Sequence, residues 1–165
     1  MTSMSKQTQI LGFIGWLVVS FVTSAVGAIA SITTREFYVE LTQPSWAPPG
    51  WLFGPVWTIL FAMMAIAAWL VWRNGGFSNN RVALTLFLGQ LVLNGLWSWL
   101  FFAWHQGALA LADITLLWIL IAATIIAFWK VRPLAGMLLV PYLLWVSFAA
   151  VLSYTMWQLN PQILG

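Results

Sequence analysis

The sequence has very little charge. Only 5% of its 165 residues are Asp, Glu, Lys or Arg, whereas soluble domains carry about a quarter. Hydrophobic residues make up 62% of the chain. So few charged side chains cannot cover a surface in water, which excludes an ordinary soluble domain, a disordered chain and a nucleic-acid-binding protein. The composition therefore predicts an integral membrane protein.

Cysteine is absent, and His105 is the single histidine. The lack of thiols excludes disulfides, thiolate metal sites and cysteine nucleophiles. One histidine and three scattered acidic residues do not supply a multi-histidine metal site, so we expect no metal. The sequence also lacks a phosphate-binding loop, a nucleophile elbow, an HExxH motif and paired carboxylates. We therefore expect no required cofactor, and hydrolytic chemistry has few residues to use.

The spacing of the charged residues predicts the number of membrane spans. Long stretches without a charge cover residues 7–34, 41–72 and 133–165. Residues 82–129 carry only His105 and Asp113, and this stretch suits two spans, because a helix crosses the hydrocarbon in about 20 residues. The polar break Trp104–Gly107 divides it. We predict an all-α five-helix bundle, a single domain over 1–165, with helices at about 10–33, 51–72, 82–103, 108–129 and 134–158.

The first span has a second interpretation. Lys6, an apolar stretch and the small residues Ala28 and Ala30 resemble a cleavable signal peptide. The apolar part is longer than a typical signal core, so we favour a retained helix. A β-barrel is disfavoured, because apolar runs such as Ala108–Trp129 are continuous rather than alternating.

The basic residues predict the orientation in the membrane. With five spans, the segments on one face hold no acidic residue and these basic ones: Lys6, Arg73, Arg81, Lys130 and Arg132. The opposite face holds Arg35, Glu36 and Glu40. Because cytoplasmic loops are enriched in Lys and Arg, we predict a cytoplasmic N-terminus. We expect the membrane to be a bacterial one.

The first loop, residues 34–50, is the longest polar segment between spans. Its early part can form a short amphipathic turn, and Pro44, Pro48 and Pro49 stiffen its later part. Two interpretations remain open. The loop is either a rigid connector with interfacial aromatic residues or a lid over a cavity between helices.

The sequence has 13 tryptophans, and they divide into two groups. Four lie at predicted helix ends, where indole rings commonly anchor a protein at the interface: Trp46, Trp51, Trp72 and Trp104. Three others, Trp57, Trp97 and Trp145, lie deeper in the predicted helices. Each shares a helix face with a second residue: Trp57 with Phe61, Trp97 with Asn94, and Trp145 with Ala149. These faces serve either helix packing or an aromatic pocket for a flat apolar ligand.

Asp113 is the only acidic residue inside a predicted span. An acid within a membrane is a candidate functional group. Its position about one turn from the helix start places it near the interface, so we favour a structural role. That role is either a pair with His105 or a capped turn.

Several motifs together resemble the TspO/translocator protein family of tryptophan-rich sensory proteins. They match the family's order and spacing from about residue 10 to 160 and are specific in combination: Pro44–Trp51, Phe53–Trp57, Leu93–Ser98, Leu100–Phe102, Asp113 with Leu117 and Trp118, Pro141–Ala149 and Trp157–Asn160. The resemblance implies a five-helix bundle, often a homodimer, in a lipid bilayer. It also implies a pocket beneath the first loop for porphyrins, haem, sterols and benzodiazepine-type ligands.

Carried over by position, the resemblance implies a ligand-binding pocket formed by Tyr38, Pro48, Trp57, Phe61, Asn94, Trp97, Trp145 and Ala149. Two departures stand out. Ser153 occupies a position where the family usually has asparagine, and no basic residue comes after Arg132. The second departure removes the C-terminal form of a weak sterol motif, which needs a basic residue after a tyrosine.

The resemblance supports three functional hypotheses. The preferred one is a membrane receptor or regulatory protein that binds tetrapyrroles and is linked to their homeostasis and to stress. The second is a light-dependent enzyme that degrades protoporphyrin through Trp57, because an excited porphyrin generates reactive oxygen and an indole is easily oxidised. The third is a transporter of small apolar solutes.

Overall fold

The computed structural model describes residues 4–32 and 34–165, and this part of the chain contains helices and no strand. Within these described residues, five helical segments are long and apolar enough to cross a membrane. The segments are α1 (Lys6–Ala30), η1 (Gly50–Leu52) with α3 (Phe53–Trp72), α5 (Arg81–Ser98) with η2 (Trp99–Ala103), α6 (Gly107–Val131) and α7 (Pro133–Leu159). The chain is thus an all-α membrane bundle, as predicted, and the boundaries lie within a few residues of the expected ones.

Local sequence signals explain where several helices begin. The Ser5 side chain accepts a hydrogen bond from the Thr8 backbone N–H at 3.1 Å, which caps α1. Pro133 opens α7 directly after extended Arg132, because proline suits a first helical turn that needs no N–H donor. The α6–α7 connection is therefore a single extended residue.

Two short helices lie between the long ones, α2 (Thr34–Glu40) and α4 (Gly76–Asn79), and a third, α8 (Pro161–Leu164), follows α7. The expected amphipathic turn of the first loop corresponds to α2, whereas α4 and α8 were not predicted. At α4, Gly75 has a positive φ of 113°, a conformation that favours glycine. The buried Asn80 amide then donates hydrogen bonds to the carbonyls of Val71, Asn74 and Gly76, which fixes the turn from α3 into α5.

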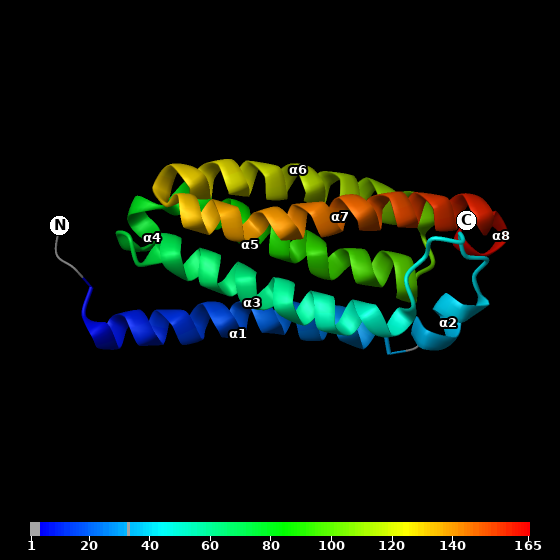
Figure 1. The fold of residues 1–165 in the computed structure, drawn as a ribbon, viewed down its shortest axis with the longest axis horizontal. Helices are drawn as coiled ribbons and strands as arrows, with labels where there is room; N and C mark the ends of the chain where they lie inside the picture. Colours follow the sequence, from blue (N-terminus) through cyan, green and yellow to red (C-terminus); the bar gives the residue numbers. More distant parts are fainter. Residues whose placement is uncertain (1–3, 33) are drawn as a thin grey trace.

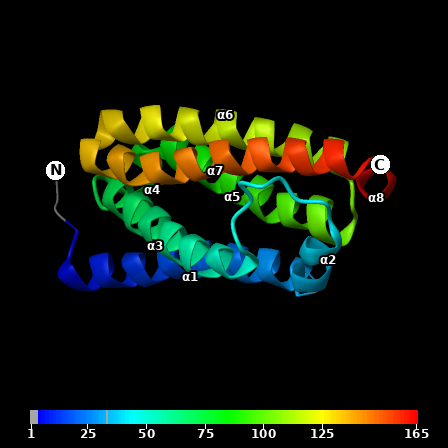
Figure 2. The same cartoon turned by 45° about the vertical axis from the view of Figure 1, so that its right-hand side comes forward.

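The long helices run roughly alongside one another (Figure 1). Helix α6 packs against α5 and α7, while α1 packs against α3 and α5 on the other side of the bundle (Figure 2). Met64, Phe87 and Tyr142 are fully buried between the helices. Residues such as Ile10, Val18 and Val92 are exposed on the outside, the arrangement that a helix surface facing lipid requires.

The charged residues separate along the long axis of the bundle. Helix α2, which carries Glu36 and Glu40, lies at the end opposite α4 (Figure 1). The α4 end holds the start of α1, the α3–α5 turn and the α6–α7 turn. Those segments carry Lys6, Arg73 and Arg81, together with the two basic residues at the α6–α7 turn, Lys130 and Arg132. The cytoplasmic location of this end stays a prediction.

The predicted break at Trp104–Gly107 is present, but His105 and Asp113 do not pair. Helix α5 ends in the π-helical turn η2, and His105 has a positive φ of 54°. Its ring stacks on Phe37 at a centroid distance of 4.2 Å. Asp113 is buried in α6, and its Oδ2 has no hydrogen-bond partner among the described residues. Of the two structural roles considered for Asp113, the pair with His105 is therefore wrong, since the His105 ring lies against Phe37 of the first loop.

Candidate functional site

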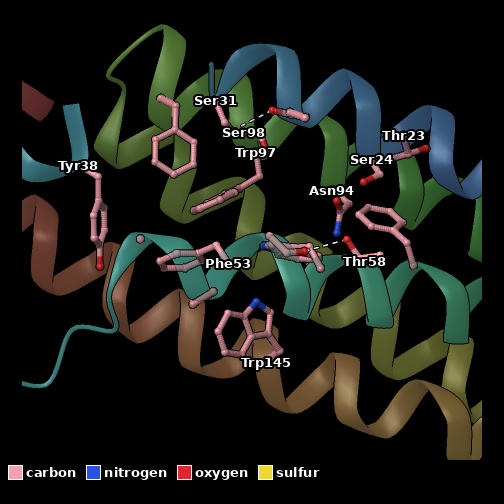
Figure 3. Close-up of a pocket in the computed structure, with 18 of the residues that line it drawn as sticks. Thr23, Ser24, Ser31, Tyr38, Phe53, Thr58, Asn94, Trp97, Ser98 and Trp145 are labelled. Carbon is pink, nitrogen blue, oxygen red and sulfur yellow. Dashed lines mark hydrogen bonds between the residues drawn. The ribbon is translucent and has the colours of Figure 1, made fainter. Parts of the chain in front are cut away.

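A cavity of about 630 Å³ lies inside the bundle near α2. Residues of α1, α2, α3, α5 and α7 line it, with η1 and η2 contributing at its edge. Figure 3 shows aromatic rings from several of these helices pointing towards the same space. No described residue in the lining is charged. The cavity therefore favours a neutral or apolar surface over an ionic one.

Aromatic side chains form much of the wall. Trp57 lies 5.7 Å from Phe61 between ring centroids, one turn apart on α3. Phe53, one turn earlier, contacts the Trp145 ring of α7 edge-on at 5.9 Å. Trp97 of α5 stacks on Phe101 at 5.4 Å. These contacts hold the rings at fixed angles, so the cavity presents preformed flat faces.

Two of these rings carry unused hydrogen-bond donors. The indole Nε1 atoms of Trp97 and Trp145 are buried and have no hydrogen-bond partner among the described residues. An indole N–H can only donate, and a buried donor without a partner costs about 1–3 kcal/mol. Both residues line the cavity. The two Nε1 atoms are themselves shielded from the cavity, so these residues present ring faces to it rather than their donors.

A polar network lies beside the aromatic wall. The Asn94 amide donates to the Tyr142 hydroxyl at 2.7 Å, and that hydroxyl donates to Gln90 Oε1 at 2.7 Å. The Gln90 amide in turn contacts the Met64 sulfur at 3.8 Å. The network joins α3, α5 and α7. Asn94 therefore has a packing role and also lines the cavity.

The first loop closes one end of the cavity. Tyr38 of α2 lines the cavity and donates its hydroxyl hydrogen to the Pro48 carbonyl at 3.0 Å. Burial raises the pKa of Tyr38 above its usual value of 10.0, which keeps the phenol protonated as a donor. The Gln43 amide also donates to the Tyr38 carbonyl. These bonds fold the loop back on itself, which is the arrangement that the lid interpretation requires.

The structure brings together almost all of the residues predicted for the pocket. These residues line the cavity: Tyr38, Trp57, Phe61, Asn94, Trp97, Trp145 and Ala149. Pro48 does not line it and instead supports Tyr38 through its carbonyl. Direct ligand contact by Pro48 stays a prediction. Ligand binding by the other residues stays a prediction.

Sequence reasoning missed the contribution of α1. Ser24, Gly27 and Ser31 line the cavity, and their spacing of three and four residues places them on one helix face. This stripe of small residues is visible in the sequence, but small residues are also common where helices pack. Phe53 was also missed, although it lies one turn before Trp57 on the same face. Trp51 lines the cavity while 67% of it is exposed.

The fold and the cavity define a class of protein: a five-helix integral membrane bundle with an uncharged aromatic pocket. The sequence pattern of the TspO/MBR family matches residues 14–158. The chain therefore belongs to the TspO/MBR family. No three His, Cys, Asp or Glu side chains lie together as metal ligands in the described part of the chain.

Relatives support this membership over most of the chain. The tryptophan-rich protein TspO of Chlorobaculum tepidum is 49% identical over 142 residues, which cover 83% of this chain and 90% of that protein. The translocator protein of Homo sapiens is 44% identical over 127 residues, covering 76% and 75%. The tryptophan-rich sensory protein of Cereibacter sphaeroides is 35% identical over 148 residues, covering 90% of each chain.

Proposed function

We propose that this protein binds porphyrins or haem, and other flat apolar ligands, inside the aromatic cavity. It would act as a membrane receptor or regulatory protein linked to tetrapyrrole homeostasis and stress. The observation that carries the proposal is the uncharged cavity of about 630 Å³ with preformed ring faces. Family membership, with relatives named as sensory and translocator proteins, supports it.

A tetrapyrrole suits this cavity because it is flat, aromatic and apolar over most of its area. Its faces would lie against Trp57, Phe61 and Trp145, and each aromatic contact contributes about 0.5–1.5 kcal/mol beyond the burial of apolar area. Tyr38 and Asn94 would supply polar contacts, and α2 would cover the bound ligand.

A titration with protoporphyrin IX tests the proposal in the dark. Binding should quench tryptophan fluorescence in the purified protein and saturate at one ligand per chain. Trp145→Ala should raise the Kd roughly tenfold, because it removes a large aromatic face. Asn94→Ala should raise it by a smaller factor. Trp104→Ala is the matched control, because Trp104 is exposed and does not line the cavity.

The result decides the site assignment. If both cavity variants keep their thermal stability and bind protoporphyrin as tightly as the Trp104→Ala control, the ligand does not occupy this cavity. If the unaltered protein shows no saturable quenching, tetrapyrrole binding itself is wrong.

A second candidate function is light-dependent porphyrin degradation. Trp57 favours it, because its ring lines the cavity and would place an oxidisable indole beside a bound porphyrin. The Trp57 ring also packs against the Tyr142 ring, with 6.1 Å between the ring centroids. Dioxygen, excited by the illuminated porphyrin, would be the oxidant and would supply the oxygen added to the macrocycle. The same titration, repeated under light and air, should show slower bleaching in Trp57→Phe. Equal bleaching in both proteins would remove Trp57 from the chemistry.

A further inference from the structure

A second, open groove lies on the outside of the bundle at the α4 end, away from the aromatic cavity. Its volume is about 620 Å³, and it runs between the start of α5 and the end of α6. It shares no residue with the cavity. Both polar and apolar side chains line it.

The end of the groove near α4 is polar and positively charged. Ser78 and Asn79 of α4 line it together with Arg81, the first residue of α5, and Lys130 in the last turn of α6. All four residues are exposed. The acidic residues of the chain lie elsewhere, because Glu36 and Glu40 are on α2 and Asp113 is near the start of α6. The two cations therefore lack an acidic partner at this end of the bundle.

The rest of the groove is apolar. Ala123 and Ala127 lie one turn apart on α6, and their small side chains leave a depression between the helices. Val82 and Ile126 flank it and are 74% and 59% exposed. These residues belong to the membrane-spanning segments. The apolar part would therefore face the acyl chains of the bilayer.

We propose that this groove binds one anionic phospholipid. The phosphate would lie between Arg81 and Lys130, with hydrogen bonds from Ser78 and Asn79, and an acyl chain would run along the apolar part over Ala123. Basic pockets between transmembrane helices suit anionic headgroups in this way. Free phosphate would leave the apolar part unused. A second copy of the chain in the same orientation would bring its own basic end beside this one, and the like charges would repel.

Native mass spectrometry of the detergent-solubilised protein tests the proposal with phosphatidylglycerol and phosphatidylcholine of the same chain length. The double variant Arg81→Gln/Lys130→Gln should lose affinity for phosphatidylglycerol roughly thirtyfold. Its affinity for phosphatidylcholine, whose phosphate charge is balanced by its own choline group, should fall by less than about threefold. The control Lys6→Gln/Arg132→Gln removes the same charge from the same end but lies outside the groove. It should change either affinity by less than about threefold.

Two further measurements distinguish a bound lipid from free phosphate and from diffuse charge attraction. Ala123→Leu keeps both cations and narrows the apolar part, so it should also weaken phosphatidylglycerol binding. Inorganic phosphate should not displace the lipid. Equal losses in the two double variants would mean diffuse attraction rather than a site. Displacement by phosphate at the same concentration, or unchanged binding in Arg81→Gln/Lys130→Gln, would also overturn the proposal. None of these outcomes depends on porphyrin binding.

Discussion

At the scale of single residues, the buried hydroxyl of Tyr142 makes two hydrogen bonds that a phenylalanine at this position could not make. It accepts a hydrogen bond from Asn94 and donates one to Gln90, both at 2.7 Å. All three side chains are buried. In a bilayer, where water is absent, a polar side chain without a partner is costly. Tyr142 of α7 therefore satisfies two amides of α5 that would otherwise be buried without a partner.

The variant Tyr142→Phe tests this role. It should lower the free energy of unfolding by about 1–2 kcal/mol, because the Asn94 donor and the Gln90 acceptor both lose their partner. Thermal unfolding of the detergent-solubilised protein measures the change. Tyr154→Phe is the matched control on the same helix, since Tyr154 is 50% exposed. Equal melting temperatures for the two variants would show that the network contributes nothing to stability.

At the scale of helices, close contact between α1 and α3 depends on one glycine. A Cβ atom at Gly12 would lie 2.1 Å from the Trp72 ring, whereas a Cβ at Gly15 would meet nothing within 4 Å. The Trp69 indole of α3 also donates to the Gln9 carbonyl of α1 at 2.9 Å. The two helices are therefore held together by a ring packed on a bare backbone and by a hydrogen bond beside it.

A pair of alanine substitutions on the same helix tests this contact. Gly12→Ala should destabilise the protein by about 1–3 kcal/mol, because the Trp72 ring must move out of a packed position. Gly15→Ala should be neutral or slightly stabilising, since alanine is the better helix former. Resistance to unfolding in a denaturing detergent ranks the two variants. If Gly12→Ala is as stable as Gly15→Ala, Trp72 does not fix the distance between α1 and α3.

At the scale of the whole molecule, Asn160 ties the first loop to the end of the last span. Its side chain accepts a hydrogen bond from the Thr42 N–H at 2.8 Å and donates to the Thr42 carbonyl at 3.0 Å. It also donates to the Met156 carbonyl at the end of α7. Asn160 is buried. This contact joins parts of the chain 118 residues apart and holds the loop over the cavity.

Replacing Asn160 should loosen the loop without unfolding the bundle. In Asn160→Ala we expect backbone amides in residues 36–48 to exchange hydrogen with solvent about tenfold faster, because two bonds to Thr42 are lost. Hydrogen–deuterium exchange with mass spectrometry measures this locally. Gln158→Ala is the matched control, since Gln158 is exposed near the same helix end. Unchanged exchange in Asn160→Ala would mean that Tyr38 and Gln43 suffice to hold the loop.

The helices and their inward faces could be predicted from the sequence, whereas several contacts between helices could not. The spans could be predicted from charge spacing, because a charge inside hydrocarbon is costly and the helix is the simplest way to satisfy the backbone there. The positions of Trp57, Trp97 and Trp145 on inward faces could be predicted from helical periodicity. The contribution of α1 to the cavity and the His105–Phe37 stack could not. They depend on which helices become neighbours and on a left-handed turn, and neither leaves a local pattern.

The sequence by itself determined the membrane class, the number of spans, the separation of charge between the two ends and the family. Each of these depends on residue composition, order or short-range spacing, which the bilayer and helical geometry convert directly into structure. Only the tertiary structure decided which rings share one cavity, that Pro48 supports Tyr38 rather than lining the cavity, and that Arg81 and Lys130 both line one groove. These contacts join residues from different helices, and their geometry is set by side-chain packing across the whole bundle.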